Sequence, residues 1–229
     1  MERMTPEQLL GPLNEVEKKI APPYLYIKGD RDILNRGPRV SIIGSRHASS
    51  DGLSNAKELS KFLVENDVII VSGLALGIDT IAHKTAIEEG GKTIAVLGTS
   101  LNRYYPQENC DLQDEIMKNH LAISQFPPTY PTQRKNFPMR NKTMALISDA
   151  SIIVEAGDTS GSLHQGWTAL QLGRPLVILE SVAKNSKLKW PQEMIKYGAR
   201  VIRPQQIEEL IGELPSSGYR GGIDVALKS

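Results

Sequence analysis

The chain has 229 residues, 40% of them hydrophobic and 23% charged, with a formal net charge of +1. This composition suits a globular protein with one substantial core, and the near-neutral charge means that any nucleic-acid contact needs a local basic patch. A single cysteine, Cys110, excludes an internal disulfide and a cysteine-based zinc cluster. With no membrane-spanning apolar run and no basic-then-apolar leader at Met1, we expect a cytoplasmic protein that needs no membrane, metal or cofactor.

Residues 1–37 are expected to lead into the main fold. Apolar residues at helix-like spacing predict one helix over 1–22, which the Ala21-Pro22-Pro23 stop would end. A short strand is expected at 24–27. Gly29 and the Gly37-Pro38 pair then predict a turn-rich exit.

Strands and helices alternate over residues 38–215. We expect strands at 39–43, 67–72, 93–97, 121–124, 151–155, 175–180 and 200–202. We expect helices at 52–65, 78–89, 109–119, 138–148, 162–172, 190–197 and 205–212. The alternation predicts an α/β fold with a mostly parallel sheet and helices on both faces. Residues 216–229, rich in Ser, Gly and charge, are expected to form a poorly ordered tail.

The first predicted site group follows strand 39–43 and consists of Gly44, Ser45 and Arg46. Turns at the carboxyl ends of parallel strands build anion-binding crevices, because helix N-termini present free N–H groups and a positive dipole end. Arg46 is placed to grip a phosphate. The alternative is that Arg46 pairs with an acidic neighbour at the sheet edge.

The second group, Ser72, Gly73 and Gly77, follows strand 67–72. Its two glycines would let the backbone approach a ligand closely, and Asp79 would cap the helix that it opens. His83 follows Asp79 by four residues on the same helix face, and a structural contact between them is favoured over a catalytic pair.

The third group combines cations with one aromatic ring at a loop-to-helix junction. Its candidate residues are Arg134, Lys135, Asn136, Phe137, Arg140, Asn141 and Lys142. Cations beside a ring on which a base can stack are typical of single-strand binding. The alternative is a solvated run of charges.

The fourth group, Ser160, Gly161 and Ser162, follows strand 151–155 and opens helix 162–172. It predicts another phosphate cradle, with a plain capped turn as the alternative. His47, His120 and His164 are scattered and lack metal-ligand spacing.

These motifs together resemble the DprA/Smf family of DNA-processing proteins over about residues 24–202. The resemblance is carried by Gly44-Ser45-Arg46, Ser72-Gly73-Leu74-Ala75-Leu76-Gly77-Ile78-Asp79, Ala82-His83, Gly91-Lys92-Thr93-Ile94-Ala95-Val96-Leu97-Gly98, Tyr105-Pro106, Asn109, Ser124, Pro127-Pro128, Asn136-Phe137-Pro138, Arg140-Asn141, Val154-Glu155-Ala156 and Ser160-Gly161-Ser162-Leu163.

The resemblance implies an extended Rossmann-like fold that binds single-stranded DNA in a basic pocket and acts as a homodimer. It further implies that the protein hands the strand to a RecA-type recombinase in transformation. Arg46, Phe137 and Arg140 match the family's DNA-contacting positions, with Arg134 or Lys135 near its basic pocket. The chain departs from many members in having no winged-helix tail and no full N-terminal helical domain. Trp167 is a further departure, expected to reshape the crevice or to pack beneath it.

The same superfamily includes the LOG-type phosphoribohydrolases, whose signature P-G-G-x-G-T-x-x-E places a glutamate at the position of Gln165. A neutral amide cannot act as a general base as a carboxylate does, so this residue argues against hydrolysis. The substitution does not exclude nucleotide binding, so a small-nucleotide sensor or a LOG-like hydrolase is kept as the alternative function.

Overall fold

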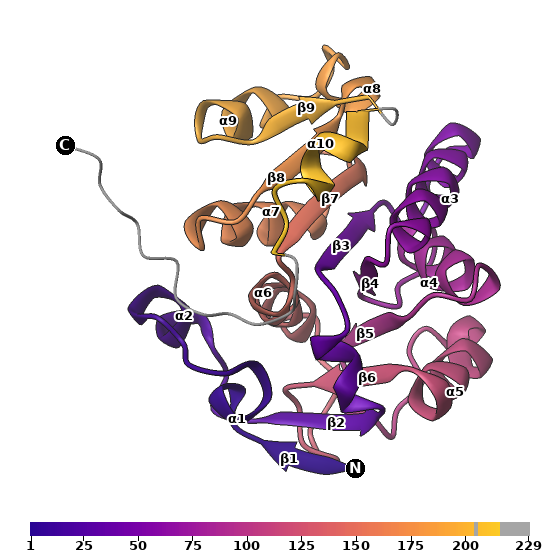
Figure 1. The fold of residues 1–229 in the computed structure, drawn as a ribbon, viewed down its shortest axis with the longest axis vertical. Helices are drawn as coiled ribbons and strands as arrows, with labels where there is room; N and C mark the ends of the chain where they lie inside the picture. The colour runs from indigo at the N-terminus through magenta and orange to yellow at the C-terminus, as the bar shows by residue number, and fades with distance from the viewer. Residues whose placement is uncertain (204–205, 216–229) are drawn as a thin grey trace.

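The computed structural model describes residues 1–203 and 206–215, which build one nine-stranded sheet with the order β1-β2-β6-β5-β4-β3-β7-β8-β9 (Figure 1). The strands are β1 (Glu2–Met4), β2 (Leu25–Gly29), β3 (Arg39–Gly44), β4 (Ile69–Ser72), β5 (Thr93–Leu97), β6 (Leu121–Ser124), β7 (Ala150–Glu155), β8 (Leu176–Leu179) and β9 (Arg200–Ile202). The pairs β1–β2 and β2–β6 are antiparallel and all other pairs are parallel. The predicted α/β fold with a mostly parallel sheet is confirmed.

Helices cover both faces of the sheet, as the sequence predicts (Figure 1). On one face lie α1 (Pro6–Leu10), α2 (Glu15–Ile20), α6 (Asn136–Ile147), α7 (Ser162–Gln171), α8 (Glu180–Ala183) and α9 (Trp190–Lys196). On the other lie α3 (Ser50–Glu65), α4 (Ile78–Glu88), α5 (Cys110–Asn119) and α10 (Ile207–Ile211). Two short 3₁₀ turns, Arg31–Asn35 and Gln107–Asn109, complete the described elements. No helix in the described ranges is long and apolar enough to cross a membrane.

The prediction of one helix over 1–22 is wrong. Residues 2–4 form an edge strand, and two short helices follow. Thr5 and Asn14 each start a helix with a capping box, and Gly11, with φ of 82°, ends the first one. These local stop and start signals outweigh the apolar spacing. The predicted tail, 216–229, lies outside the described residues.

Strand β3 lies at the point where the strand order reverses. The chain runs from β3 through β4 and β5 to β6 on one side, and α6 then carries it back to β7 on the other side of β3. Ligands of open α/β sheets bind outside the carboxyl ends of the strands at such a reversal. A ligand site is therefore expected at the turns after β3 and β7.

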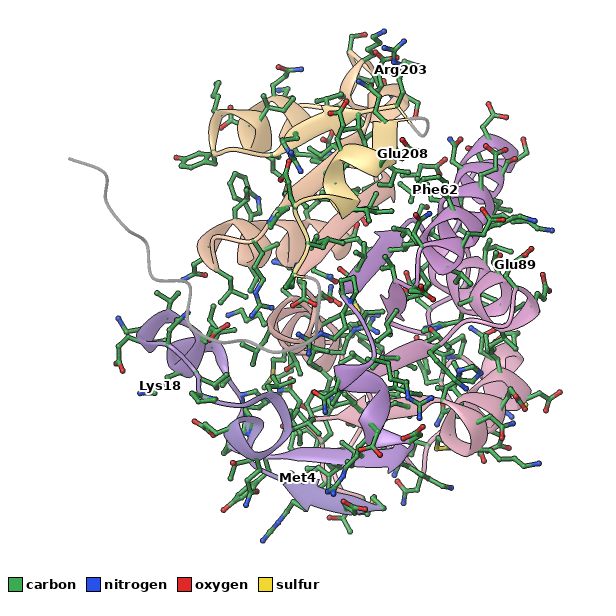
Figure 2. The ribbon with its side chains drawn as sticks, viewed as in Figure 1. Met4, Lys18, Phe62, Glu89, Arg203 and Glu208 are labelled. Atoms are coloured by element: carbon green, nitrogen blue, oxygen red, sulfur yellow. The ribbon has the colours of Figure 1, made fainter. Side chains whose placement is uncertain are left out.

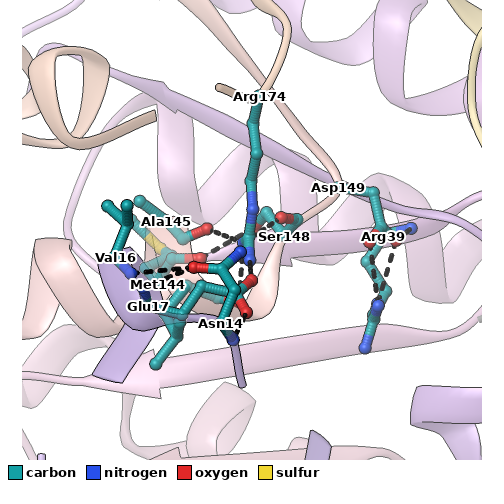
Figure 3. A network of polar contacts seen from close by, with 10 residues as sticks. Asn14, Val16, Glu17, Arg39, Met144, Ala145, Ser148, Asp149 and Arg174 are labelled. Atoms are coloured by element: carbon teal, nitrogen blue, oxygen red, sulfur yellow. Dashed lines mark hydrogen bonds and ion pairs between the residues drawn. The ribbon is translucent and has the colours of Figure 1, made fainter. Parts of the chain in front are cut away.

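A buried arginine ties the far end of α6 to its surroundings (Figure 3). Arg174 Nη1 donates to the backbone oxygens at the end of α6, those of Ala145, Leu146 and Ser148. Its Nη2 pairs with Glu17 of α2 at 2.6 Å. Burial lowers the pKa of Arg174, and the Glu17 carboxylate opposes that effect. The contact fixes α6, and with it the N-terminal segment, against the sheet.

Charged side chains lie mainly on the outer faces of the helices, where Lys18 and Glu89 project away from the sheet (Figure 2). A different arrangement holds Arg39, which pairs with Asp149 at 2.8 Å while both side chains are nearly inaccessible. This pair joins the start of β3 to the start of β7, the two strands whose far ends border the site.

Candidate nucleic-acid interface

A cavity of about 480 Å³ lies at the carboxyl ends of β3 and β7, where the strand order reverses. Its walls come from the turn after β3, the first turns of α6, the loop 157–161 and the start of α7. The predicted site residues that line it are Gly44, Ser45, Arg46, Phe137, Arg140, Asn141, Ser160, Gly161 and Ser162. The first, third and fourth predicted groups therefore meet in one place.

An exposed cation and an aromatic ring lie together at this cavity. The Arg46 guanidinium carbon is 5.3 Å from the centroid of the Phe137 ring, a cation–π distance. Phe137 is half-buried, with the Tyr105 ring at 5.2 Å and the Gly98 backbone beneath it. Within the described part of the chain Arg46 makes no ion pair, so the alternative of a pairing with an acidic neighbour is wrong.

Arg140 also reaches the cavity, but it is only 5% exposed. Its Nη1 donates to the backbone oxygens of Gly73 and Val96. Burial lowers the pKa of Arg140 to about 10, while the attraction of Asp79 opposes that shift. Burial also raises the pKa of the Asp79 carboxyl, against the pull of Arg140. Arg140 is therefore a buried charge that holds β4 and β5 to α6.

The second predicted group lies behind the cavity and not in its lining. Ser72 is inaccessible and donates to the Ile42 oxygen at 2.6 Å. Gly73 is in contact with the Arg140 guanidinium, so the space beside its Cα is filled by protein rather than by ligand. Gly77, with φ of 74°, packs in the same way against the backbone of the turn after β3. The prediction that Gly73 and Gly77 let the backbone approach a ligand is therefore corrected, because protein atoms fill the space beside both.

The sequence predicts a structural contact between Asp79 and His83, but each side chain bonds to other residues instead. Asp79 accepts from the Gly73 and Ala75 amides at 3.2 and 3.3 Å, so it fixes the preceding loop instead of capping α4. His83 Nδ1 lies 2.7 Å from Thr93 Oγ1. Burial lowers the pKa of His83 to about 3, which keeps the ring neutral at pH 7.

The N-termini of α3 and α7 differ in the groups that lie against them. At α3, the Glu155 carboxylate accepts from the Ser49 amide at 3.1 Å and from its hydroxyl at 2.5 Å. The Glu155 carboxylate therefore already occupies the N-terminus of α3. At α7 the first turn holds no acidic residue, and the Ser160 hydroxyl, 2.6 Å from that of Ser162, accepts from the Ser162 amide at 3.4 Å. An external anion is therefore expected at the start of α7.

The other residues of the third group take separate places. Arg134, Lys135 and Lys142 are exposed outside the cavity lining, and their role in binding stays a prediction. Asn136 is buried and donates to the Pro131 oxygen at 3.2 Å, so it supports the loop before α6. Asn141 donates to the Gly161 oxygen at 2.8 Å and joins α6 to the start of α7.

The sequence profile of the family described as DNA recombination-mediator protein A matches residues 5–215. The chain belongs to this family. The DNA processing protein DprA of Bacillus subtilis is 34% identical over 85% of this chain, and that of Streptococcus pneumoniae is 38% identical over 81%. The chain covers 65% of the length of each of these relatives.

Solved structures of family members agree with the fold. The structure of Streptococcus pneumoniae DprA superposes with a TM-score of 0.77 at 31% identity, covering 93% of this chain and 74% of that one. Helicobacter pylori DprA, whose structure concerns its single-stranded DNA binding mode, gives a TM-score of 0.78 at 28% identity and covers 94% of this chain and 98% of that one. The expected DprA/Smf membership and Rossmann-like fold are confirmed.

Trp167, which departs from the family pattern, and Gln165, which replaces the glutamate of the LOG-type signature, lie on opposite sides of α7. Trp167 does not line the cavity and is 38% exposed, with its ring edge-to-face against Tyr197 at 5.4 Å. It therefore neither reshapes the crevice nor packs beneath it. Gln165 is inaccessible and lines the cavity instead. Tyr105, which supports Phe137, stands out in the sequence only as part of the Tyr105-Pro106 motif, because nothing local in the sequence indicates its tertiary contact.

Proposed function

We propose that this chain binds single-stranded DNA at the cavity, with a phosphate at the start of α7 and a base against Phe137. The observation that carries the proposal is the Arg46–Phe137 pair, which sets a ring beside a cation that has no ion pair among the described residues, at the cavity that includes the start of α7. Stacking on a ring combined with phosphate attraction is how proteins bind single strands without sequence preference. The binding mode reported for Helicobacter pylori DprA supports the same ligand class.

The wider role that we propose is to protect single-stranded DNA and to hand it to a RecA-type recombinase during transformation or recombination. Support comes from the family's description as a recombination mediator and from the relatives named DNA processing proteins. The recombinase as partner rests on family membership alone.

If Phe137 stacks on a base, its removal should weaken DNA binding while leaving the stability of the fold nearly unchanged. Because Phe137 is half-buried at the cavity, Phe137→Ala should weaken oligo-dT binding by about 1–3 kcal/mol. Phe126, only 2% exposed, is the matched control, and Phe126→Ala should cost about 3–5 kcal/mol of stability. Fluorescence anisotropy titration and thermal melting of both variants measure the two effects. A Phe137→Ala protein that melts far below wild type and binds DNA normally would overturn the proposal.

We further propose that the cavity binds nucleotides without cleaving a glycosidic bond. Glycoside hydrolysis normally uses two carboxyl groups. Among the described residues that line the cavity, only Asp79 carries one, and its carboxylate already accepts from two backbone amides. Incubation with a panel of nucleoside monophosphates should release no free base by chromatography. Base release that scales with protein concentration would establish the hydrolase alternative.

A homodimer is also proposed, through exposed apolar side chains of the C-terminal half, namely Trp167, Tyr197 and Val201. These side chains are 38%, 70% and 40% exposed. The buried strand β8 is the weaker candidate, because Val177 and Ile178 are inaccessible core residues. Multi-angle light scattering tests the dimer, and Tyr197→Asp should shift it toward monomer. A wild-type monomer at micromolar concentration would refute the dimer.

A further inference from the structure

Tyr105 is the more exposed of two aromatic rings that touch beside the cavity. Its ring centroid lies 5.2 Å from that of Phe137, and the two ring planes are tilted by 44°. Phe137 has further neighbours, because the Arg46 guanidinium carbon lies 5.3 Å from its centroid and the Gly98 backbone lies against its ring. Tyr105 is 45% exposed, so a large part of its side chain is free to meet a ligand.

The neighbouring Tyr104 shows what distinguishes Tyr105 from an ordinary exposed ring. Tyr104 is 41% exposed, but its hydroxyl donates to the Asp114 carboxylate of α5 at 2.8 Å. Tyr105 instead contacts the ring that lies beside the Arg46 cation. Single exposed apolar side chains are normal on a protein surface and need no ligand. The contact with the Phe137–Arg46 pair is therefore what singles out Tyr105.

The loop that carries Tyr105 is held in place by buried side chains on both sides of it in the sequence. Gln113 of α5 is 1% exposed and donates to the backbone oxygen of Arg103 at 3.1 Å. Asn109 is 4% exposed and donates to the backbone oxygen of Leu74 at 3.0 Å. A ring that is positioned before binding loses less conformational entropy on binding than a mobile one.

Two rings in contact suit two successive bases of one strand. Proteins that bind single strands stack successive bases on separate aromatic side chains, and such stacking tolerates any base. Bases that lie flat on Phe137 and on Tyr105 would be tilted relative to each other, as the two rings are. The strand would then bend between the two bases, which an unpaired strand can do.

We propose that Tyr105 forms a second stacking position, which holds the base next to the one at Phe137. The ligand is a single strand with at least two adjacent unpaired bases. This inference rests on the proposed binding of single-stranded DNA at the same cavity. It goes beyond that function because it adds a position outside the cavity lining and predicts that two adjacent bases bind better than the same two bases kept apart.

The test varies both the ring and the spacing of the bases. Tyr105→Leu removes the ring but keeps an apolar side chain beside Phe137, Tyr105→Phe keeps the ring, and Tyr104→Leu is the matched control. The ligands are two labelled strands of equal length in which every residue except two thymidines is abasic. The thymidines are adjacent in one strand and separated by several abasic residues in the other. Both strands therefore carry the same numbers of phosphates and bases.

Wild type, Tyr105→Phe and Tyr104→Leu should bind the strand with adjacent thymidines about tenfold more tightly than the other, which corresponds to about 1.4 kcal/mol. Tyr105→Leu should bind both strands alike, with the affinity of wild type for the separated thymidines. Equal binding of the two strands by wild type would overturn the inference. A preference that survives in Tyr105→Leu, or that is lost in Tyr105→Phe or Tyr104→Leu, would overturn it too.

Tyr105→Trp adds a measurement that a loss of stability in Tyr105→Leu would not affect. Its fluorescence should fall when the strand with adjacent thymidines binds, because a stacked base quenches an indole, whereas Tyr104→Trp should keep its signal. The native Trp167 and Trp190 lie outside the cavity lining, and wild type supplies their background. Unquenched Tyr105→Trp at saturating strand would overturn the inference. Failure of the proposed function has a different signature, because wild type would then bind neither of these strands nor oligo-dT.

Discussion

Replacing Arg140 by methionine should destabilise the protein before it affects any ligand. Arg140 is 5% exposed, and its guanidinium donates to the Gly73 and Val96 oxygens and attracts the buried Asp79 carboxylate. Removing one partner of a buried charge interaction costs about 3–5 kcal/mol. For a chain of this size, each kcal/mol lowers the melting temperature by about 2–4 °C. We therefore expect Arg140→Met to melt roughly 6–20 °C below wild type.

The pH dependence of this loss identifies its cause. Burial raises the folded-state pKa of Asp79 above its ordinary value of 3.8, and without Arg140 nothing of opposite charge opposes that rise. A carboxyl group whose pKa is raised on folding stabilises the fold when protonated, and that stability is lost as pH rises through the folded pKa. The penalty of Arg140→Met should therefore shrink as pH falls from 7 toward 5.

Calorimetry and urea denaturation of Arg140→Met, Asp79→Asn and the double variant measure the coupling. The double variant should recover part of the loss, because neither unpaired charge remains. An Arg140→Met protein that melts like wild type at every pH but fails to bind oligo-dT would refute the reasoning, and Arg140 would then be a direct DNA contact.

Three further predictions concern the supports of the site and the core. A Cβ on Gly98 would lie 2.6 Å from the Phe137 ring, so Gly98→Ala should weaken oligo-dT binding more than Gly161→Ala, whose Cβ meets nothing closer than 3.7 Å. Burial lowers the pKa of His83 from 6.5 to about 3, so stability should fall by up to about 1.4 kcal/mol per pH unit as pH drops from 6.5; acid titration of His83→Asn should lack this component. Arg174→Met, which removes the 2.6 Å ion pair with Glu17 and the donors to the end of α6, should lower stability by about 3–5 kcal/mol, and urea denaturation at constant pH measures it.

The sequence predicts the sheet well, because buried parallel strands are runs of β-branched residues. The expected strands at 93–97 and 200–202 coincide with β5 and β9. The sequence predicts helix ends less well, because helix stop and start signals can lie within one continuous apolar pattern. Gly11 is such a stop signal and divides the expected first helix. The caps decide such segments, and apolar spacing alone does not show them.

The site shows a different limit. The sequence marks Gly73 as a position that needs glycine, but not which atoms fill the space beside it. Arg140 fills it from 67 residues away. In the same way, Arg140 belongs to a run of charges that suggests solvent, and only tertiary packing shows that it is buried. Exposed Arg46 is the residue whose predicted role needs no distant partner, and it is found where expected.

The central claim, that the cavity beside β3 binds single-stranded DNA, is tested most directly by salt-dependent binding of Arg46→Ala. Anisotropy titrations of a labelled oligo-dT at several salt concentrations compare it with wild type and with Lys118→Ala, an exposed cation on α5 outside the cavity lining. We predict that Arg46→Ala lowers affinity and flattens the log–log salt slope by about 0.7, one phosphate contact, without changing the melting temperature. Lys118→Ala should match wild type. Wild-type affinity and slope in Arg46→Ala would contradict the claim and place the DNA elsewhere.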